Sequence, residues 1–260
     1  MNRSPNPDYG IDSPAIVLGQ GIAGLSATAL AIFKARAFGV QVRWIEAAAA
    51  LYFLHGAWSM VRYSRSGKLG LREKLLDMFP WRGDEAVLDV GCGKGLLLVG
   101  AARRLKTGKA IGVDVWLSHA LTGNRPEFAL ENAAIEGVRD RVELKQADVR
   151  ELPFEDDSFH VVVSNFVVHE MNTSADRARM LQEIARVLRP GGRLALIDFI
   201  FTKECVEILR QAGLSDTRRV RLGGLSFWVA ALLMLGTFQL HAVTATKPLS
   251  TGRNSPLTGP

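Results

Sequence analysis

Three glycines in one short run are the residues of this sequence best suited to chemistry on a bound ligand. Val87–Gly95 reads VLDVGCGKG and places Gly91, Gly93 and Gly95 directly after a short apolar segment. Glycine lets the backbone turn tightly and approach a ligand with no Cβ in the way. The GxxxxGK[ST] spacing of a P-loop is absent, so the run predicts a ligand-binding loop of another class.

Acidic residues follow this loop at spacings that suit a nucleoside. Asp114 comes about 20 residues later, in the run Gly112–Val115, where a carboxylate can accept hydrogen bonds from both ribose hydroxyls. A dehydrogenase would use the same arrangement. Asp148, between Ala147 and Val149, can accept a hydrogen bond from the exocyclic amine of adenine.

The elements that must position these residues are read from hydrophobic periodicity. Helices are expected at 96–105, 125–136, 174–188 (capped by Ser174) and 203–212. Short β-branched runs predict strands at 86–89, 110–113, 142–144, 159–164 and 193–199. Strands that alternate with helices predict a parallel sheet covered on both faces. Such sheets bind ligands at the carboxyl ends of their strands.

Five successive motifs together resemble a known family. VLDVGCGKG, GVDV, QADVRELPFEDDSF, VVVSN and LRPGGRLALID are similar to the ordered motifs of class I S-adenosylmethionine-dependent methyltransferases, over roughly residues 84–200. The resemblance is strongest to the small-molecule group that includes the ubiquinone and menaquinone C-methyltransferases. It implies a Rossmann-like, seven-stranded, mostly parallel sheet with helices on both faces, and S-adenosyl-L-methionine as cofactor.

The resemblance also implies roles for individual residues. The glycines would lie beneath the methionine and ribose parts of the cofactor, Asp89 would orient its amino-acid end, and Trp116 would either cover the adenine or serve only in packing. The family often has Asp where this chain has His160, which puts a polar contact there in doubt. The implied cofactor-binding residues are Asp89, Gly91, Gly93, Gly95, Asp114, Val115, Ala147, Asp148, Val149, Ser164 and Asn165.

A catalytic side chain is harder to name. Methyl transfer from a sulfonium needs alignment more than activation, so no metal is predicted, but an acceptor that must lose a proton needs a base. His169 is the candidate, because it follows the fourth strand where the acceptor should lie. The competing interpretation is a pocket-lining or helix-capping side chain. A membrane-proximal location favours a small-molecule acceptor that is lipid- or quinone-like.

The N-terminal region, residues 1–75, has a different character. Pro14–Phe33 carries no charge and is long enough to cross a bilayer, and Ala47–Val61 is a shorter apolar run. Aromatic residues in or beside the second run (Trp44, Tyr52, Trp58 and Tyr63) suit a membrane interface, and the basic cluster that follows (Arg62, Arg65, Lys68, Arg72 and Lys74) would place that end in the cytoplasm. We therefore expect an apolar helical hairpin at the membrane and a cytoplasmic catalytic domain. Lys34, Arg36 and Arg43 argue against a clean hairpin, and a helical cap on a soluble domain is the alternative.

The same region contains a competing motif. Gly19, Gly21 and Gly24 match GxGxxG, and Glu46 follows at the spacing of a ribose-binding acid, as in a flavin- or NAD-dependent oxidoreductase. A lone GxGxxG is weak, and the chain has little room for such an enzyme before the second glycine loop. A membrane-tethered protein that binds the cofactor without turnover is a third hypothesis.

Composition and the C-terminal third complete the picture. The net charge of +6 is scattered over most of the chain, which predicts a solubilising surface rather than nucleic-acid binding. Cys92 and Cys205 form no CxxC pair, so neither a disulfide scaffold nor a zinc site is expected. We expect a catalytic domain over residues 76–248 with its final strand at 240–246, an apolar insertion at 226–237 that does not span the membrane, and a disordered tail at 249–260.

Overall fold

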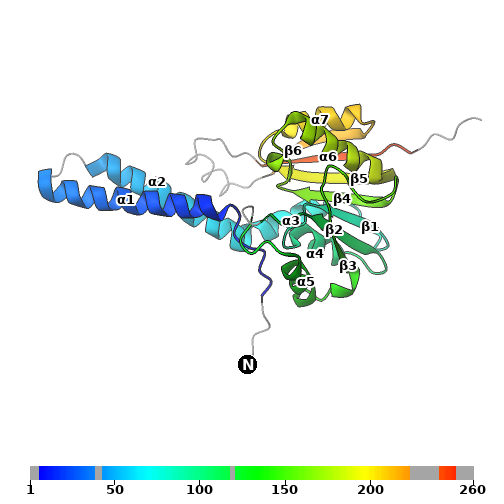
Figure 1. The fold of residues 1–260 in the computed structure, drawn as a ribbon, viewed down its shortest axis with the longest axis horizontal. Helices are drawn as coiled ribbons and strands as arrows, with labels where there is room; N and C mark the ends of the chain where they lie inside the picture. The colour runs from blue at the N-terminus through cyan, green and yellow to red at the C-terminus, as the bar shows by residue number, and fades with distance from the viewer. Residues whose placement is uncertain (1–5, 39–42, 118–120, 223–239, 250–260) are drawn as a thin grey trace, which may run out of the picture.

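The computed structural model describes residues 6–38, 43–117, 121–222 and 240–249. Its centre is a seven-stranded sheet in the order β3-β2-β1-β4-β5-β7-β6 (Figure 1). Only β7 runs antiparallel to its neighbours. The predicted Rossmann-like, seven-stranded, mostly parallel sheet is thus confirmed. The strands are β1 (Ala86–Val90), β2 (Lys109–Asp114), β3 (Val142–Gln146), β4 (Phe159–Asn165), β5 (Leu188–Asp198), β6 (Ser215–Arg221) and β7 (His241–Thr246).

Helices cover both faces of this sheet. One buried apolar cluster joins α3, α4 and α5 to one face, and a second joins α6 and α7 to the other. The first includes Leu75 and Leu98 and the second Met180 and Leu209, none of which is exposed to solvent. These helices are α3 (Lys68–Leu76), α4 (Leu96–Ala102), α5 (Pro126–Ile135), α6 (Ser174–Val187) and α7 (Thr202–Gln211).

The region around α6 and β5 differs in detail from the prediction. Thr173, not Ser174, caps α6, because its hydroxyl accepts the backbone N–H of Asp176 at 3.0 Å. The helix ends at Val187, and β5 begins at Leu188 rather than at Arg193. Leu188 pairs with Phe159 across the sheet, so strand pairing ends the helix before the Pro-Gly-Gly sequence does. The expected insertion at 226–237 and residues 250–260 of the expected tail lie outside the described residues.

The N-terminal region forms the expected helical hairpin. Helix α1 (Pro14–Phe38) packs along α2 (Arg43–Arg62), and the pair projects away from the sheet (Figure 1). Gly19, Gly21 and Gly24 all lie inside α1, and Gly24 packs under Leu54 of α2. A dinucleotide site needs these glycines in the turn between a strand and a helix. The oxidoreductase interpretation of the GxGxxG motif is therefore wrong.

The basic cluster that follows the hairpin is only partly a surface feature. Arg62 and Arg65 are exposed, but Lys68 and Arg72 are buried where α3 packs on the domain. The Arg72 guanidinium donates to the Glu136 carboxylate at 2.8 Å. Of the basic cluster expected from Arg62 to Lys74, Lys68 and Arg72 are therefore not available to a membrane surface, because they are buried with α3.

Candidate cofactor site and active site

The predicted binding residues converge because their strands end at the same edge of the sheet. In the strand register, Val90 lies opposite both Val113 and Ser164, and Asn165 lies opposite Ile197. The loops after β1, β2, β4 and β5 therefore meet at one place. This is the carboxyl edge of the parallel strands, where such sheets bind ligands.

The glycine loop folds back over β2. The backbone N–H groups of Gly91 and Cys92 both donate to the carbonyl of Val113, at 2.8 and 3.0 Å. Gly91 has a φ of +73°, and a Cβ built on it would lie 2.2 Å from Cγ2 of Val167. Both the turn and the close approach therefore require glycine at this position.

Asp114 holds the loop to the end of β2. One oxygen of its carboxylate accepts the backbone N–H of Gly93 at 2.7 Å, and the other accepts that of Trp116 at 2.6 Å. The indole of Trp116 donates back to the carbonyl of Gly93 at 3.1 Å. Trp116 therefore lies against the glycine loop, and Val115 beside it is exposed. The carboxylate is positioned at the loop, as a ribose-binding acid must be.

Asp89 lies beneath the loop rather than at its surface. It is 1% exposed, and its carboxylate accepts the backbone N–H of Leu98 at 2.8 Å. Burial, together with the nearby charge of Asp114, raises the pKa of Asp89 to about 8. The structure thus shows Asp89 tying β1 to α4, and its predicted role toward the amino-acid end of a cofactor stays a prediction.

Two buried amide oxygens at this edge have no hydrogen-bond partner among the described residues. They are Oδ1 of Asn165, which ends β4, and Oδ1 of Asn124, which lies 3.6 Å from the Cβ position of Gly93. A buried acceptor left unpaired costs roughly 1–3 kcal/mol. Ser164, by contrast, is engaged, because its hydroxyl donates to the carbonyl of Val90 at 2.8 Å. The unpaired oxygens suit a ligand rich in N–H and O–H donors.

The residues after β3 form the next part of the site. The backbone N–H of Ala147 donates to the carbonyl of Asp114 at 3.2 Å, which places this turn beside the acid, and Val149 is buried. The Asp148 carboxylate pairs with Arg150 at 2.7 Å. The hydrogen bond from Arg150 lowers the pKa of Asp148. Asp148 is thus held as an anion, and its contact with adenine stays a prediction.

His169 is partnered by a buried carboxylate that the sequence analysis did not single out. Nδ1 of His169 and its backbone N–H both lie 3.2 Å from Oδ2 of Asp198, which is fully buried at the end of β5. Nε2 lies 3.3 Å from Glu170. The ring packs against Phe199, with 4.7 Å between centroids. The signal for Asp198 was present, since it ends the run LRPGGRLALID.

The surroundings of His169 shift its pKa. Burial favours the neutral ring, but the hydrogen bond and negative charge of Asp198, together with Glu170, outweigh burial and raise the pKa. A ring held by a carboxylate on Nδ1 presents Nε2 for proton transfer. His169 and Asp198 thus have the geometry of a base and the group that orients it.

His160 replaces the expected Asp without loss of the polar contact. Its Nδ1 accepts the backbone N–H of Ala86 at 2.9 Å, so the imidazole joins β4 to the start of β1. Burial and the charge of Arg189 lower the pKa of His160. The ring is therefore neutral at pH 7 and can serve as an acceptor.

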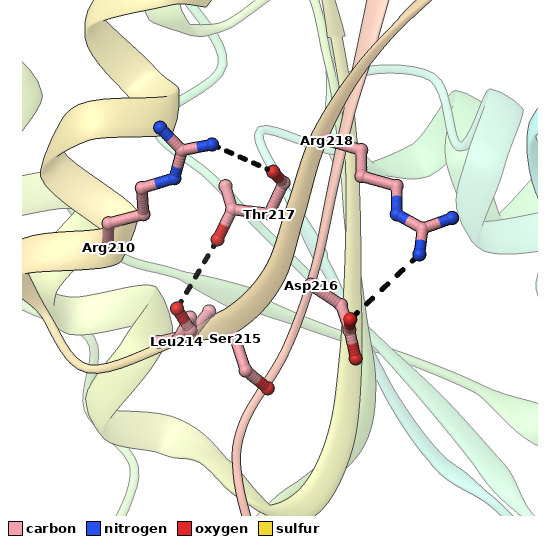
Figure 2. Close-up of a pocket in the computed structure, with 6 residues that line it drawn as sticks. All are labelled: Arg210, Leu214, Ser215, Asp216, Thr217 and Arg218. Carbon is pink, nitrogen blue, oxygen red and sulfur yellow. Dashed lines mark hydrogen bonds and ion pairs between the residues drawn. The ribbon is translucent and has the colours of Figure 1, made fainter.

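An open cavity of about 280 Å³ lies elsewhere on the domain (Figure 2). It is lined by Arg210, Leu214, Ser215, Asp216, Thr217 and Arg218. Ser215 and Arg193 both lie opposite Thr246, five residues before Asp198 at the carboxyl end of β5. The cavity is therefore at the opposite edge of the sheet from the glycine loop, and it is not part of the candidate site.

Comparison with known proteins agrees with this geometry. Residues 87–192 match the family model described as a methyltransferase domain. The chain is 37% identical over 172 residues to the 27-O-demethylrifamycin SV methyltransferase of Amycolatopsis mediterranei (strain S699), covering 66% of this chain and 57% of that protein. The domain belongs to the S-adenosylmethionine-dependent methyltransferases. The chain is also 32% identical over 163 residues to the demethylmenaquinone methyltransferase of Symbiobacterium thermophilum, covering 62% of this chain and 56% of the relative.

Solved structures support the fold of this domain. A geranyl diphosphate methyltransferase in complex with GPP and sinefungin superposes with a TM-score of 0.57 at 20% identity, covering 74% of this chain and 81% of that one. At this identity the likeness concerns the fold alone. The chain spans about half the length of the curated relatives named above.

Proposed function

We propose that this protein transfers a methyl group from S-adenosyl-L-methionine to an apolar small molecule that reaches the site from a membrane, with His169 as the base. The observation that carries the proposal is the meeting of the glycine loop, Asp114 and the His169–Asp198 pair at the carboxyl edge of one sheet. A cofactor loop and a proton acceptor at one edge are what a methyltransferase with an ionisable acceptor needs.

The residues present suit the cofactor. Asp114 would hold the ribose, the glycine loop would lie beneath the ribose and methionine parts, and Ala147, Asp148 and Val149 would frame the adenine. The unpaired oxygens of Asn124 and Asn165 are available for its N–H and O–H donors. When bound, S-adenosylmethionine supplies a methyl group that is already activated as a sulfonium.

His169 would take the proton that the acceptor loses. Asp198 holds the ring through Nδ1, and Nε2, which lies 3.3 Å from the Glu170 carboxylate, is the nitrogen that would exchange the proton. The same carboxylate would stabilise the imidazolium that forms. The neighbouring Phe166 and Phe199 surround His169 with apolar rings, which favours a hydrophobic acceptor over a charged one. Positioned general bases contribute typically 10²–10⁴-fold to a rate.

The hairpin supports a membrane location. The segment Pro14–Ala37 is long and apolar enough to cross a bilayer, and only 6% of its most apolar window is buried. Its 25-residue helix measures about 37 Å, against about 30 Å for the hydrocarbon core. Large apolar side chains are exposed on both helices, including Leu18, Leu25 and Phe33 on α1 and Leu51 and Trp58 on α2.

The charged residues near the far end of the hairpin fit the same arrangement. Lys34 is 20 residues from Pro14, about 30 Å along α1, and pairs with Glu46 of α2 at 2.6 Å. The two charges therefore neutralise each other where the helices would leave the hydrocarbon core. Arg62 and Arg65 are exposed at the domain end, which by the positive-inside rule favours a cytoplasmic catalytic domain.

The acceptor class can be tested with the full-length protein in membranes. Lipid extracts are incubated with the protein and S-adenosylmethionine labelled in its methyl group, and the products are separated by polarity. We expect label in an apolar, extractable product, and His169→Gln should reduce its formation by about 10²-fold or more. Label confined to water-soluble products would contradict a membrane acceptor. Cofactor binding without any labelled product would favour a tethered binding protein.

A further inference from the structure

A short segment that precedes the hairpin contacts the cofactor loop from outside the sheet. We call residues Asp8–Asp12 the strap. After Ser13 the strap continues into α1. The hydroxyl of Ser64, which lies just after the end of α2, donates to the Asp12 carboxylate at 2.8 Å. The two ends of the hairpin are thus joined at the domain, and the strap is the part of the N-terminal region that lies on the methyltransferase fold.

Two buried lysines anchor the strap. The ammonium of Lys94, in the glycine loop, lies 2.7 Å from the Asp8 carboxylate, and Lys68 donates to the carbonyls of Tyr9 and Gly10 at 2.6 and 2.7 Å. Each lysine is only 3% exposed. Lysine is almost never fully buried unless it is paired. The strap therefore supplies the partners that let both lysines stay inside.

The strap reaches the glycine loop by a second route. The backbone N–H of Ile11 donates to the hydroxyl of Thr122 at 2.6 Å, and the backbone N–H of Thr122 donates to the carbonyl of Ile11 at 3.2 Å. Next to Thr122, Leu121 lies 3.5 Å from the Cβ position of Gly93. The amide of Asn132 also joins the strap to the loop, because it donates to the carbonyls of both Asp8 and Lys94.

We propose that the strap is a working part of the cofactor site and that Asp8 is a positioning residue for the glycine loop. Without the Asp8 charge, the buried ammonium of Lys94 loses its carboxylate, and the loop must shift before the ammonium can reach water. The loop then loses the geometry in which Gly93 faces the ligand. The domain recognised from its motifs is therefore incomplete without residues that lie ahead of the hairpin.

The affinity of the full-length protein for a cofactor analogue, measured in detergent, tests this role. The proposal rests on the proposed function, because the ligand is chosen from it. S-adenosylhomocysteine is titrated by calorimetry into wild type and Asp8→Asn. We expect the dissociation constant to rise about tenfold. The Asp8 side chain is itself 78% exposed, so the effect should not be much larger and the variant should fold. Asp84→Asn, which breaks an exposed pair with Arg82, is the matched control and should leave affinity unchanged.

A double-mutant cycle separates positioning from a merely structural role. Lys94→Met removes the charge that Asp8 neutralises, so adding Asp8→Asn to it should cost no further affinity, and Asp8→Glu should retain wild-type affinity. Unchanged affinity in Asp8→Asn, or a lower melting temperature with unchanged affinity, would overturn the role of the strap. If wild type itself fails to bind the ligand, the proposed function fails instead, so the two failures are distinguishable.

Discussion

Replacing Gly91 by alanine tests whether the glycine loop is shaped by a close approach or by backbone conformation alone. Gly91 and Gly137 share a φ of +73°, so alanine at either position carries the same left-handed strain, on the order of 1–2 kcal/mol. They differ in surroundings. A Cβ at Gly91 would lie 2.2 Å from Cγ2 of Val167, whereas nothing lies within 4 Å of one at Gly137. Gly137→Ala is therefore a matched control for strain.

The clash adds a cost that the control lacks. Carbon atoms pack at about 3.5–4.0 Å, so Val167 or the loop must move by more than an ångström, and such overpacking costs typically 1–3 kcal/mol. Gly91→Ala should thus destabilise the protein by about 2–5 kcal/mol and Gly137→Ala by about 1–2, measured by denaturant unfolding. Cofactor affinity by calorimetry should fall only for Gly91→Ala. Equal stability losses with equal affinities would refute the argument from close approach.

Three further predictions concern the base, the cofactor and the membrane. If His169 is the base, kcat should rise with pH through a pKa above 6.5. Asp198→Asn should lower that pKa, moving the acid limb of the kcat profile to lower pH, and an unmoved limb would contradict the pairing. Asp114→Ala should weaken S-adenosylhomocysteine binding about ten- to hundredfold in calorimetry, with the exposed Asp216→Ala as control, and wild-type affinity would refute its role. Full-length protein should stay with membranes through a high-salt wash, and release by salt would mean that charge alone holds it there. Replacing residues 14–61 by a short flexible linker should leave a soluble protein that still binds cofactor.

Local patterns were sufficient for most of the fold. The β-branched runs before Gly91 and Asp114 form β1 and β2. The alternating run at 240–246 forms β7, which begins one residue later than predicted, at His241. Buried parallel strands and tight glycine turns depend on residues that are close together in the sequence. The types of those residues are therefore enough to predict them. The boundaries of β5 were set wrongly because the pairing of Leu188 with Phe159 involves residues far apart in sequence.

The sequence by itself determined the family, the cofactor loop, the candidate base and the apolar character of the N-terminal region, because each is written in consecutive residues. Only the tertiary structure decided which contacts these residues make. Asp198 stands 29 residues after His169 and Asp8 stands 86 before Lys94, and no local pattern joins residues so distant. Two of the basic residues after the hairpin prove to be buried, and the GxGxxG run proves to be helix interior. In both cases the residues that decide the environment are distant in the sequence. Lys68 and Arg72 are buried against the domain, and Gly24 packs against α2.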